Sequence, residues 1–458
     1  ISTMLLLSMG ATLLAGCGTT AGNGTEGGAS NAAEGKVINI YSWNDEFRTR
    51  VEAVYPEVKE TSKDGTITYL KDGTEIHWVV NPNQDGVYQQ KLDEALSKQA
   101  DAAADDKVDM FLVEADYALK YVNTDLCMSV ADLGIKDSEL ANQYQYTKDI
   151  MTDTDGNLKG LSWQGCPGVL FYNRAAAKEV LGTDDPDKVQ EALSTWDKFD
   201  KVAEQAAAKG YKMLSGYDDS YRVFSNNVSA PWVDSNNKIV IDDNIMKWVD
   251  QTKKYTDKGY NNKSSLWDST WAADQGPSGK VFGFFYSTWG INFTLLGNSL
   301  ATPVKEGGKE EVGNGIYGDY AVCEGPQSYY WGGTWICAAA GTDNANLVKD
   351  VMKTLCCDKA TMKKITEDTQ DYTNTTSGMN EIASSNFKSD FLGGQNHIKL
   401  FAKSAPKISM KNISSYDQGL NEEFQKAMKD YFDGNVTKDK ALDNFYKAAI
   451  EKYPNLSK

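Results

Sequence analysis

Two segments carry the strongest fold signal in the chain, GLSWQGCPGVLFYNRAAAKEVLG at residues 160–182 and STWDKFDKVAEQAAAKG at residues 194–210. In the first, Val169–Tyr172 is a short apolar run of branched and aromatic residues that follows glycine and proline, which favours a buried strand. In the second, apolar residues recur every three or four positions after Ser194 or Thr195, either of which suits a helix N-cap. The segments therefore predict a buried β-strand followed by an amphipathic helix.

The loop before this strand contains Trp163 and Gln164, which suggests the floor of a ligand cleft. Three blocks in this region resemble extracellular solute-binding proteins of sugar ABC importers, the maltose-binding protein class. They are Leu161-Ser162-Trp163, Leu170-Phe171-Tyr172-Asn173-Arg174 and Thr195-Trp196-Asp197-Lys198-Phe199. The resemblance implies a type II periplasmic-binding-protein-like α/β fold, with two lobes, a three-strand hinge and the ligand cleft between the lobes.

The resemblance also divides the chain. It implies an N-terminal lobe of residues 37–161 and 335–396, and a C-terminal lobe of residues 162–334 and 397–458. The three crossings would lie near Ser162, near Gly333 and at about His397. A protein of this class closes its lobes around the ligand, acts as a monomer and presents the closed form to the permease subunits of an ABC transporter.

The start of the sequence predicts the compartment. Met4–Leu14 is a short apolar run, and Leu14-Ala15-Gly16-Cys17 resembles the bacterial lipobox, whose cysteine is lipidated. We therefore expect a signal peptide at residues 1–16, and a lipidated Cys17 with a flexible Gly- and Ser-rich tether at residues 17–36. The expected location is the extracellular face of the bacterial cytoplasmic membrane, with the lipid anchor as the only membrane contact.

Composition argues against several function classes. The formal net charge of −17 makes nucleic acid and anionic membrane surfaces poor partners and favours a neutral or cationic ligand. Apart from Cys17, six cysteines remain, with no CxxC spacing; buried thiols are the simplest interpretation, although extracellular disulfides stay open. Only two histidines are present, and no Walker A, HExxH or GxSxG motif occurs. We expect no metal site, no cofactor and no catalytic residue.

Ligands of open α/β sheets bind at the carboxyl ends of strands. Trp43, Asn44 and Asp45 follow the alternating run at residues 37–41, which predicts a strand. Glu114 and Asp116 follow a second buried run at residues 108–113. These two acids fit equally well a helix N-cap cluster or a site that accepts hydrogen bonds from ligand hydroxyls.

Further candidates come from the second half of the chain. Residues 280–290 resemble the family strand and loop that place an aromatic ring under the sugar, so Trp289 is the leading stacking residue. Residues 214–219 are expected to end another strand. The remaining candidates are Tyr217, Asp218, Trp331, Trp335 and, more weakly, Trp232 and Trp267. Each tryptophan could equally be a large core residue.

Turn chemistry and periodicity predict the other elements. Two Lys-Asp-Gly triplets, at residues 63–65 and 71–73, predict a small meander at a sheet edge. Asp153–Asn157 alternates oxygen-bearing residues but lacks the calcium-loop spacing, which favours a hairpin turn. Helices are expected at residues 88–100 and 346–357, with two more at the C-terminus.

The function hypothesis is an oligosaccharide-binding lipoprotein of an ABC importer. Aromatic rings would pack against the apolar faces of the sugar, and carboxylate and amide groups would bind its hydroxyls. Two alternatives stay open. Residues 40–45 also resemble the start of polyamine-binding proteins, in which carboxylates and aromatics surround a cation. A glycoside hydrolase would need a pair of carboxylates, which Glu114, Asp116 and Asp218 could supply.

Overall fold

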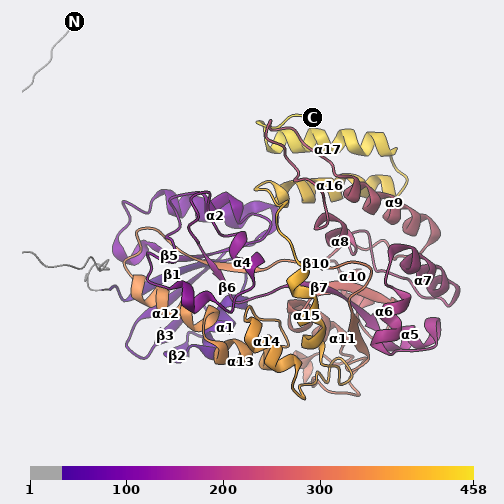
Figure 1. Cartoon of the computed structure of the whole chain (residues 1–458), viewed down its shortest axis with the longest axis horizontal. Coiled ribbons are helices and arrows are strands. Elements are labelled where there is room, and N and C mark those ends of the chain that lie inside the picture. Colours follow the sequence, from indigo (N-terminus) through magenta and orange to yellow (C-terminus); the bar gives the residue numbers. More distant parts are fainter. Residues whose placement is uncertain (1–33) are drawn as a thin grey trace, which may run out of the picture. The chain divides into compact units, whose positions relative to one another are not determined.

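Two β-sheets organise the part of the chain that the computed structural model describes, residues 34–458 (Figure 1). These residues form one unit by their contacts. The predicted signal peptide, Cys17 and nearly all of the tether lie outside the described residues. No helix within residues 34–458 is both long enough and apolar enough to span a bilayer.

The first sheet has seven strands in the order β2-β3-β4-β1-β5-β11-β6. β1 pairs in parallel with β4 and β5, and the other pairs are antiparallel. The predicted meander is confirmed as β2, β3 and β4 at one edge, with Gly65 and Gly73 at positive φ in its turns. The strands are β1 (Val37–Ser42), β2 (Val58–Thr61), β3 (Ile67–Leu70), β4 (Glu75–Val80), β5 (Val108–Glu114), β6 (Leu161–Ser162) and β11 (Thr334–Ala338).

The second sheet is built on β7 (Pro167–Asn173), the buried strand that the sequence predicts. β7 pairs antiparallel with β8 (Gly283–Ser287), β9 (Tyr320–Cys323) and β10 (Tyr329–Tyr330). The predicted amphipathic helix is α7 (Trp196–Ala208); the Thr195 hydroxyl caps it by accepting the Lys198 N–H at 3.2 Å. The strand predicted to end at residues 214–219 is not formed: residues 212–219 make only isolated bridges, at Lys212 and Gly216.

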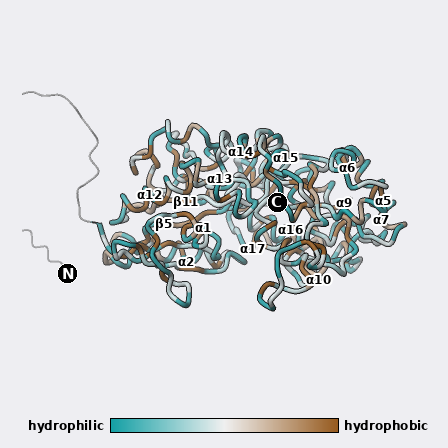
Figure 2. The backbone as a smooth tube through the Cα atoms, turned by 90° about the horizontal axis from the view of Figure 1, so that it is seen from below, coloured by the Kyte–Doolittle hydropathy of each residue, from teal (hydrophilic) through white to brown (hydrophobic). Residues whose placement is uncertain are grey.

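Helices cover both sheets, and Figure 2 shows hydrophobic and hydrophilic residues alternating along them. The helix predicted at residues 346–357 is confirmed as α12 (Ala345–Cys356). The two helices predicted at the C-terminus are confirmed as α16 (Asp417–Phe432) and α17 (Lys438–Lys452). Near the first sheet lie α1 (Glu46–Val54), α2 (Val87–Ser97), α3 (Leu119–Val122), α4 (Gln145–Asp149), α12 (Ala345–Cys356), α13 (Lys359–Thr369) and α14 (Thr376–Ala383). The others are α5 (Arg174–Leu181), α6 (Pro186–Ala192), α8 (Tyr221–Ser225), α9 (Asp243–Lys258), α10 (Ser269–Asp274), α11 (Leu296–Ser299), α15 (His397–Ser404), α16 (Asp417–Phe432) and α17 (Lys438–Lys452).

The chain passes between the two sheets at defined points. It leaves the first sheet after Ser162 and enters the second at Pro167, and it returns between Tyr330 and Thr334. A third segment, residues 371–375, runs beside the first passage: Gly165 donates its N–H to Tyr372 O, and Asn374 donates its N–H to Trp163 O, both at 2.8 Å. The first two passages lie near the predicted crossings at Ser162 and Gly333, whereas the third segment lies at residues 371–375 and His397 begins α15. The predicted lobe boundaries stay a prediction.

The six cysteines within residues 34–458 are free thiols, and five of them are buried. This agrees with the simplest interpretation of the sequence, small apolar residues inside the protein. The Asp153–Asn157 segment is a hairpin turn, in which the Asp153 carboxylate accepts backbone N–H bonds from Asp155 and Asn157. The Asp153 carboxylate therefore forms its hydrogen bonds within the turn.

Candidate functional site

Four aromatic side chains form a surface on the second-sheet side of the molecule, and we call it the aromatic surface. It consists of Trp267, Trp289, Phe293 and Trp331. Trp267 and Trp289 stack with their ring centroids 6.2 Å apart and their planes at 26°. Trp267 and Phe293 are 54% and 52% exposed, which is unusual for rings of this size. Large apolar rings held in water are a physical signal of a binding surface.

The loop that carries Trp267 is held in place from several sides. Asp218 accepts the Leu266 N–H at 3.2 Å, and Asp268 accepts the N–H groups of Ser265 and Trp271, the second as the N-cap of α10. Trp267 itself has φ +71°, a left-handed conformation that costs a bulky residue free energy. Strain of this kind persists where the surroundings impose it, and it concentrates at functional sites.

Trp289 lies two residues after the end of β8, and a hydrogen bond from its indole nitrogen holds it in place. Its Nε1 donates to Trp331 O at 2.9 Å, so the two residues are joined by a hydrogen bond as well as by ring contact. A π-helical turn at Ile291–Leu295 comes next and presents Phe293 to solvent. π-turns are rare and recur at functional sites, because they change the direction of a side chain within a helix.

Glu114, at the end of β5, lies close to this aromatic surface. A Cβ built on Gly332 would be 3.4 Å from Trp289 Nε1 and 3.7 Å from Glu114 Oε1. Gly332 therefore occupies the space between a carboxylate of the first sheet and a ring that follows the second. Its φ of +71° also suits glycine better than any other residue. Glu114, at the predicted strand end, and Trp289, the predicted stacking residue, therefore lie on either side of Gly332.

Beside Glu114, Asp116 forms a two-point ion pair with Arg222 of α8, at 2.7 and 2.6 Å. The pKa of Glu114 rises to about 8, first because the group is buried and second because of the nearby charge of Asp116. Burial therefore favours the protonated form of Glu114, which can donate a hydrogen bond. Burial likewise raises the pKa of Asp417 to about 7.

Asp116, Arg222 and Asp417 line one side of a cavity of about 210 Å³. Tyr330 of β10 and Met410 contribute to its wall. Both charged and apolar groups line this cavity, and the four rings of the aromatic surface are not among them.

Trp43 is half-buried on the first-sheet side. It makes edge contacts with Tyr88 and Tyr117, at centroid distances of 5.4 and 6.2 Å. The Tyr117 hydroxyl is buried and has no hydrogen-bond partner among the described residues. Trp43 and Trp289 both pack against the same hydrophobic cluster, which includes residues of both sheets. The two rings therefore border one shared core.

The neighbours of Trp43 have local partners. Asn44 accepts the Glu46 N–H at 3.1 Å, and Asp45, 65% exposed at its side chain, pairs with Arg48 at 3.2 Å. Both interactions belong to the start of α1. Asp218, another predicted residue, supports the Trp267 loop, and burial raises its pKa to about 6.

Several other predicted residues are buried inside the protein. Trp163 packs on Phe47 in the core of the first sheet, and Trp335 donates its Nε1 hydrogen to Thr147 O. Trp232 and Tyr217 belong to a core formed with the C-terminal helices, and Trp232 also lines the cavity beside Asp116 and Arg222. Gln164 is also buried, and its amide bonds only to the protein. Their predicted ligand contacts stay untested predictions, and the surroundings described here give them packing or hydrogen-bonding roles.

Arg222 and Phe293 belong to the site but are not predicted from the sequence. Arg222 lies in a short helix of five residues, too short for periodicity to reveal a buried face. Phe293 sits on a π-turn, which has no sequence signature of its own. A faint signal existed for Phe293, because it follows Trp289 by four residues, one helical turn.

The fold matches solved structures of binding proteins at low sequence identity. One, described as an extracellular solute-binding protein family 1, is 14% identical with a TM-score of 0.69, covering 91% of this chain and 99% of the other. An ABC transporter associated binding protein from B. animalis subsp. lactis Bl-04, in complex with beta-1,6-galactobiose, is 16% identical with a TM-score of 0.66, covering 92% and 98%.

A third is the galacto-N-biose-/lacto-N-biose I-binding protein of the ABC transporter from Bifidobacterium longum, in complex with lacto-N-biose. It is 15% identical with a TM-score of 0.65, covering 92% of this chain and 98% of the other. These matches confirm the predicted fold, a type II periplasmic-binding-protein-like arrangement with two α/β lobes. No curated protein sequence matches the chain.

The family model for bacterial extracellular solute-binding proteins matches residues 44–391, which is most of the chain and includes the aromatic surface, Glu114 and Asp116. By this match, the chain belongs to the bacterial extracellular solute-binding proteins.

Proposed function

We propose that this protein captures an oligosaccharide and delivers it to the permease of an ABC importer. The observation that carries the proposal is the aromatic surface, with Trp267 and Phe293 more than half exposed beside the carboxyl group of Glu114. The sugar-bound complexes among the similar folds support the same ligand class. Solute binding follows from the family, whereas the sugar and the permease are our inference.

The chemistry of a sugar fits these groups. The C–H faces of a pyranose ring are flat and apolar, so they pack against indole and phenyl rings, at about 0.5–1.5 kcal/mol per contact beyond area burial, by analogy with aromatic pairs. Trp267, Trp289 and Phe293 supply such rings, and Trp43 supplies one from the first-sheet side. Protonated Glu114 donates to a hydroxyl oxygen, and a site with buried polar groups rejects ligands that leave them unpaired.

The transport cycle follows from the two-lobe fold. A ligand that contacts both lobes in only one arrangement shifts the population toward that arrangement. We infer that the loaded form docks on the permease outside the cell, and that a lipidated Cys17 keeps the protein, as a monomer, at the membrane surface. Metabolic labelling with a palmitate analogue tests the anchor: the full chain takes up label, and a Cys17→Ser variant does not.

The polyamine alternative has a specific observation in its favour, the group of carboxyls at Glu114, Asp116 and Asp417. Arg222 weakens it, because its guanidinium already neutralises Asp116 at the place where an ammonium group would bind. The same ion pair weakens the hydrolase alternative, which needs a second carboxylate free to act on the substrate. We therefore place transport of a neutral sugar first.

Titration calorimetry on residues 34–458 tests the ligand class. The probes are maltotriose, cellotriose, xylotriose and a galactobiose, with spermidine as the cationic comparison. Heat with at least one oligosaccharide, and no cleaved product by chromatography after overnight incubation, is the expected result. If spermidine alone gives heat, the ligand class is a polyamine and not a sugar. Cleavage products would overturn the transport function.

A further inference from the structure

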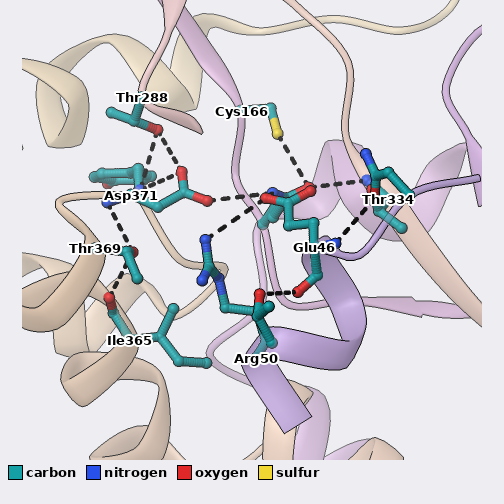
Figure 3. Close-up of polar contacts among 12 residues, drawn as sticks. Glu46, Arg50, Cys166, Thr288, Thr334, Ile365, Thr369 and Asp371 are labelled. Carbon is teal, nitrogen blue, oxygen red and sulfur yellow. Dashed lines mark hydrogen bonds and ion pairs between the residues drawn. The ribbon is translucent and has the colours of Figure 1, made fainter. Parts of the chain in front are cut away.

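Gln164 lies where the passages between the two sheets meet, and its amide joins them. Figure 3 labels the three residues to which this amide bonds, Glu46, Thr334 and Asp371. Its Oε1 accepts the Thr334 N–H of the second passage at 3.2 Å. Its Nε2 donates to Asp371 Oδ2 of the third segment at 3.2 Å, and to Glu46 Oε1 of α1 at 2.9 Å. One buried side chain of the first passage thus bonds to the other two passages and to the first helix.

Each passage also contains, or directly follows, a residue in the left-handed backbone region. Cys166 has φ +46°, Gly332 and Gly333 have φ +71° and +112°, and Gln370 has φ +64°. Gln370 is the left-handed C-cap that ends α13, immediately before the third segment. For Cys166 the conformation is disfavoured and must be imposed by neighbouring contacts, and its thiol bonds to Gln164.

Two carboxylates share the Nε2 group of Gln164, and few charges offset them. Asp371 is buried and Glu46 is half-buried, and Asp371 also accepts the Thr288 hydroxyl and the Tyr372 N–H, each at 2.7 Å. Within residues 34–458, the cation that pairs with Glu46 is Arg50, at 3.9 Å. The Cys166 thiol is the other titratable group facing them; it donates to Gln164 Oε1 at 3.8 Å, and burial raises its pKa well above its ordinary value.

Like charges in a buried space disfavour the state in which both are ionised. Burial raises the pKa of Glu46 to about 7, with Asp371 as the second cause, and burial also raises the pKa of Asp371. Because both carboxylates accept from the same Gln164 amide group, they repel each other when both are ionised; a proton on either one relieves this repulsion, and its loss as pH rises restores it.

We propose that Glu46, Gln164 and Asp371 form a proton-dependent lock on the hinge, in which one proton on the carboxyl pair keeps the three passages bonded, and its loss places two like charges on one amide group and loosens them. Gln164 is a positioning residue in this lock, acting on the passages rather than on a ligand. The lock reaches the aromatic surface through Thr288, whose hydroxyl bonds to Asp371 and whose next residue is Trp289.

The lock itself does not depend on the ligand, but its effect on affinity rests on the proposed function. If a sugar binds across both lobes, loosening the hinge lowers affinity by raising the cost of holding the closed arrangement. The affinity for the sugar should then fall as pH rises through neutrality, in parallel with the loss of hinge bonds.

Hydrogen exchange of the ligand-free protein tests the lock directly. Peptides covering residues 163–166, 331–335 and 371–375 are followed by mass spectrometry at pH 6.0 and 8.5, with intrinsic exchange rates divided out. We expect protection in these peptides to fall at least tenfold at pH 8.5, which corresponds to about one unit of pKa difference between locked and loosened states. Equal protection at the two pH values in the wild-type protein would overturn the lock.

Two variants complete the test. Glu46→Gln keeps the shape and the bond to Gln164 but cannot ionise, so the three peptides should have the same protection at both pH values. Glu52→Gln, the matched change on the same helix outside the network, should keep the wild-type pH response. A pH response that survives Glu46→Gln would overturn the proposal.

The two proposals fail separately. If no oligosaccharide binds but the exchange result holds, the lock stands and the ligand assignment falls. If a sugar binds with an affinity that is the same at pH 6.0 and 8.5 while the peptides loosen, the lock does not act on binding. An affinity that falls with pH in the wild type, and is constant in Glu46→Gln, supports both.

Discussion

Arg222 of α8 places two guanidinium nitrogens on the carboxylate of Asp116, at 2.7 and 2.6 Å, and so ties the end of β5 to the second-sheet side of the molecule. Both side chains are less than one-fifth exposed. An ion pair of this kind is costly to break from one side, because the partner left behind keeps its charge in a poorly solvated place.

We therefore expect Asp116→Asn to lower the free energy of unfolding by about 3 kcal/mol, as one-sided removal of a buried pair does. Urea unfolding followed by circular dichroism measures the change. The double variant Asp116→Leu/Arg222→Leu should recover much of the loss, since no unpaired charge remains. A double variant as unstable as the single one would show that the pair matters for more than charge compensation.

Trp267 should contribute to ligand binding and little to stability, because its ring is mostly exposed and its backbone is strained. We expect Trp267→Ala to lower the affinity for the best oligosaccharide about tenfold, or about 1.4 kcal/mol, by titration calorimetry. Trp267→Gly should lose the same affinity and be at least as stable as the alanine variant, because glycine accepts positive φ. Val304→Ala, at another exposed apolar position, is the control and should bind as the wild type does.

Gly332 separates Glu114 from Trp289, so a methyl group there should disturb the site. Gly332→Ala should cost about 1–2 kcal/mol of stability through its left-handed φ, shift the tryptophan fluorescence and weaken sugar binding. Gly73→Ala is a matched control, with φ +86° and no atom within 4 Å of the added carbon. It should show a similar backbone cost and unchanged binding; weakened binding in both variants would assign the effect to general destabilisation.

Buried carboxyl groups set the pH dependence of stability. Burial raises the pKa of Glu46 and Asp417 to about 7, and of Glu114 and Asp219 to about 8. Each group binds its proton more tightly in the folded state, so its contribution is complete below its unfolded pKa, near 4, and is lost as pH rises through the folded value.

The exposed carboxyls Asp64, Asp72 and Glu381 act in the opposite sense. Hydrogen bonds lower the pKa of each to about 2, chiefly from Ser62, the Thr74 backbone and Lys359 respectively, so their contribution is lost as pH falls below 4. The thermal midpoint should therefore be highest near pH 4–5 and fall steadily to pH 8. Glu114→Gln should flatten the upper part of this fall. A midpoint that rises between pH 5 and pH 8 would contradict these assignments.

The sequence by itself determined the local elements and the family. The apolar run that became β7, the threonine cap of α7 and the Asp-Gly turns of the meander depend on neighbours within a few residues, so their pattern is readable along the chain. Glu114 and Trp289 could be singled out because strand ends carry ligand groups in open α/β sheets. Their proximity to each other was an expectation of the family resemblance.

Only the tertiary structure decided which tryptophans face solvent. Trp163, Trp267 and Trp335 are all candidate ligand contacts by sequence, yet Trp163 and Trp335 fill the core and Trp267 is exposed. That difference depends on residues far along the chain: Trp335 bonds to Thr147, and the Trp267 loop is held by Asp218. The network of Glu46, Gln164 and Asp371 is likewise invisible in the sequence, because its members are separated by 118 and 207 residues and are brought together by the return of the chain between the two sheets.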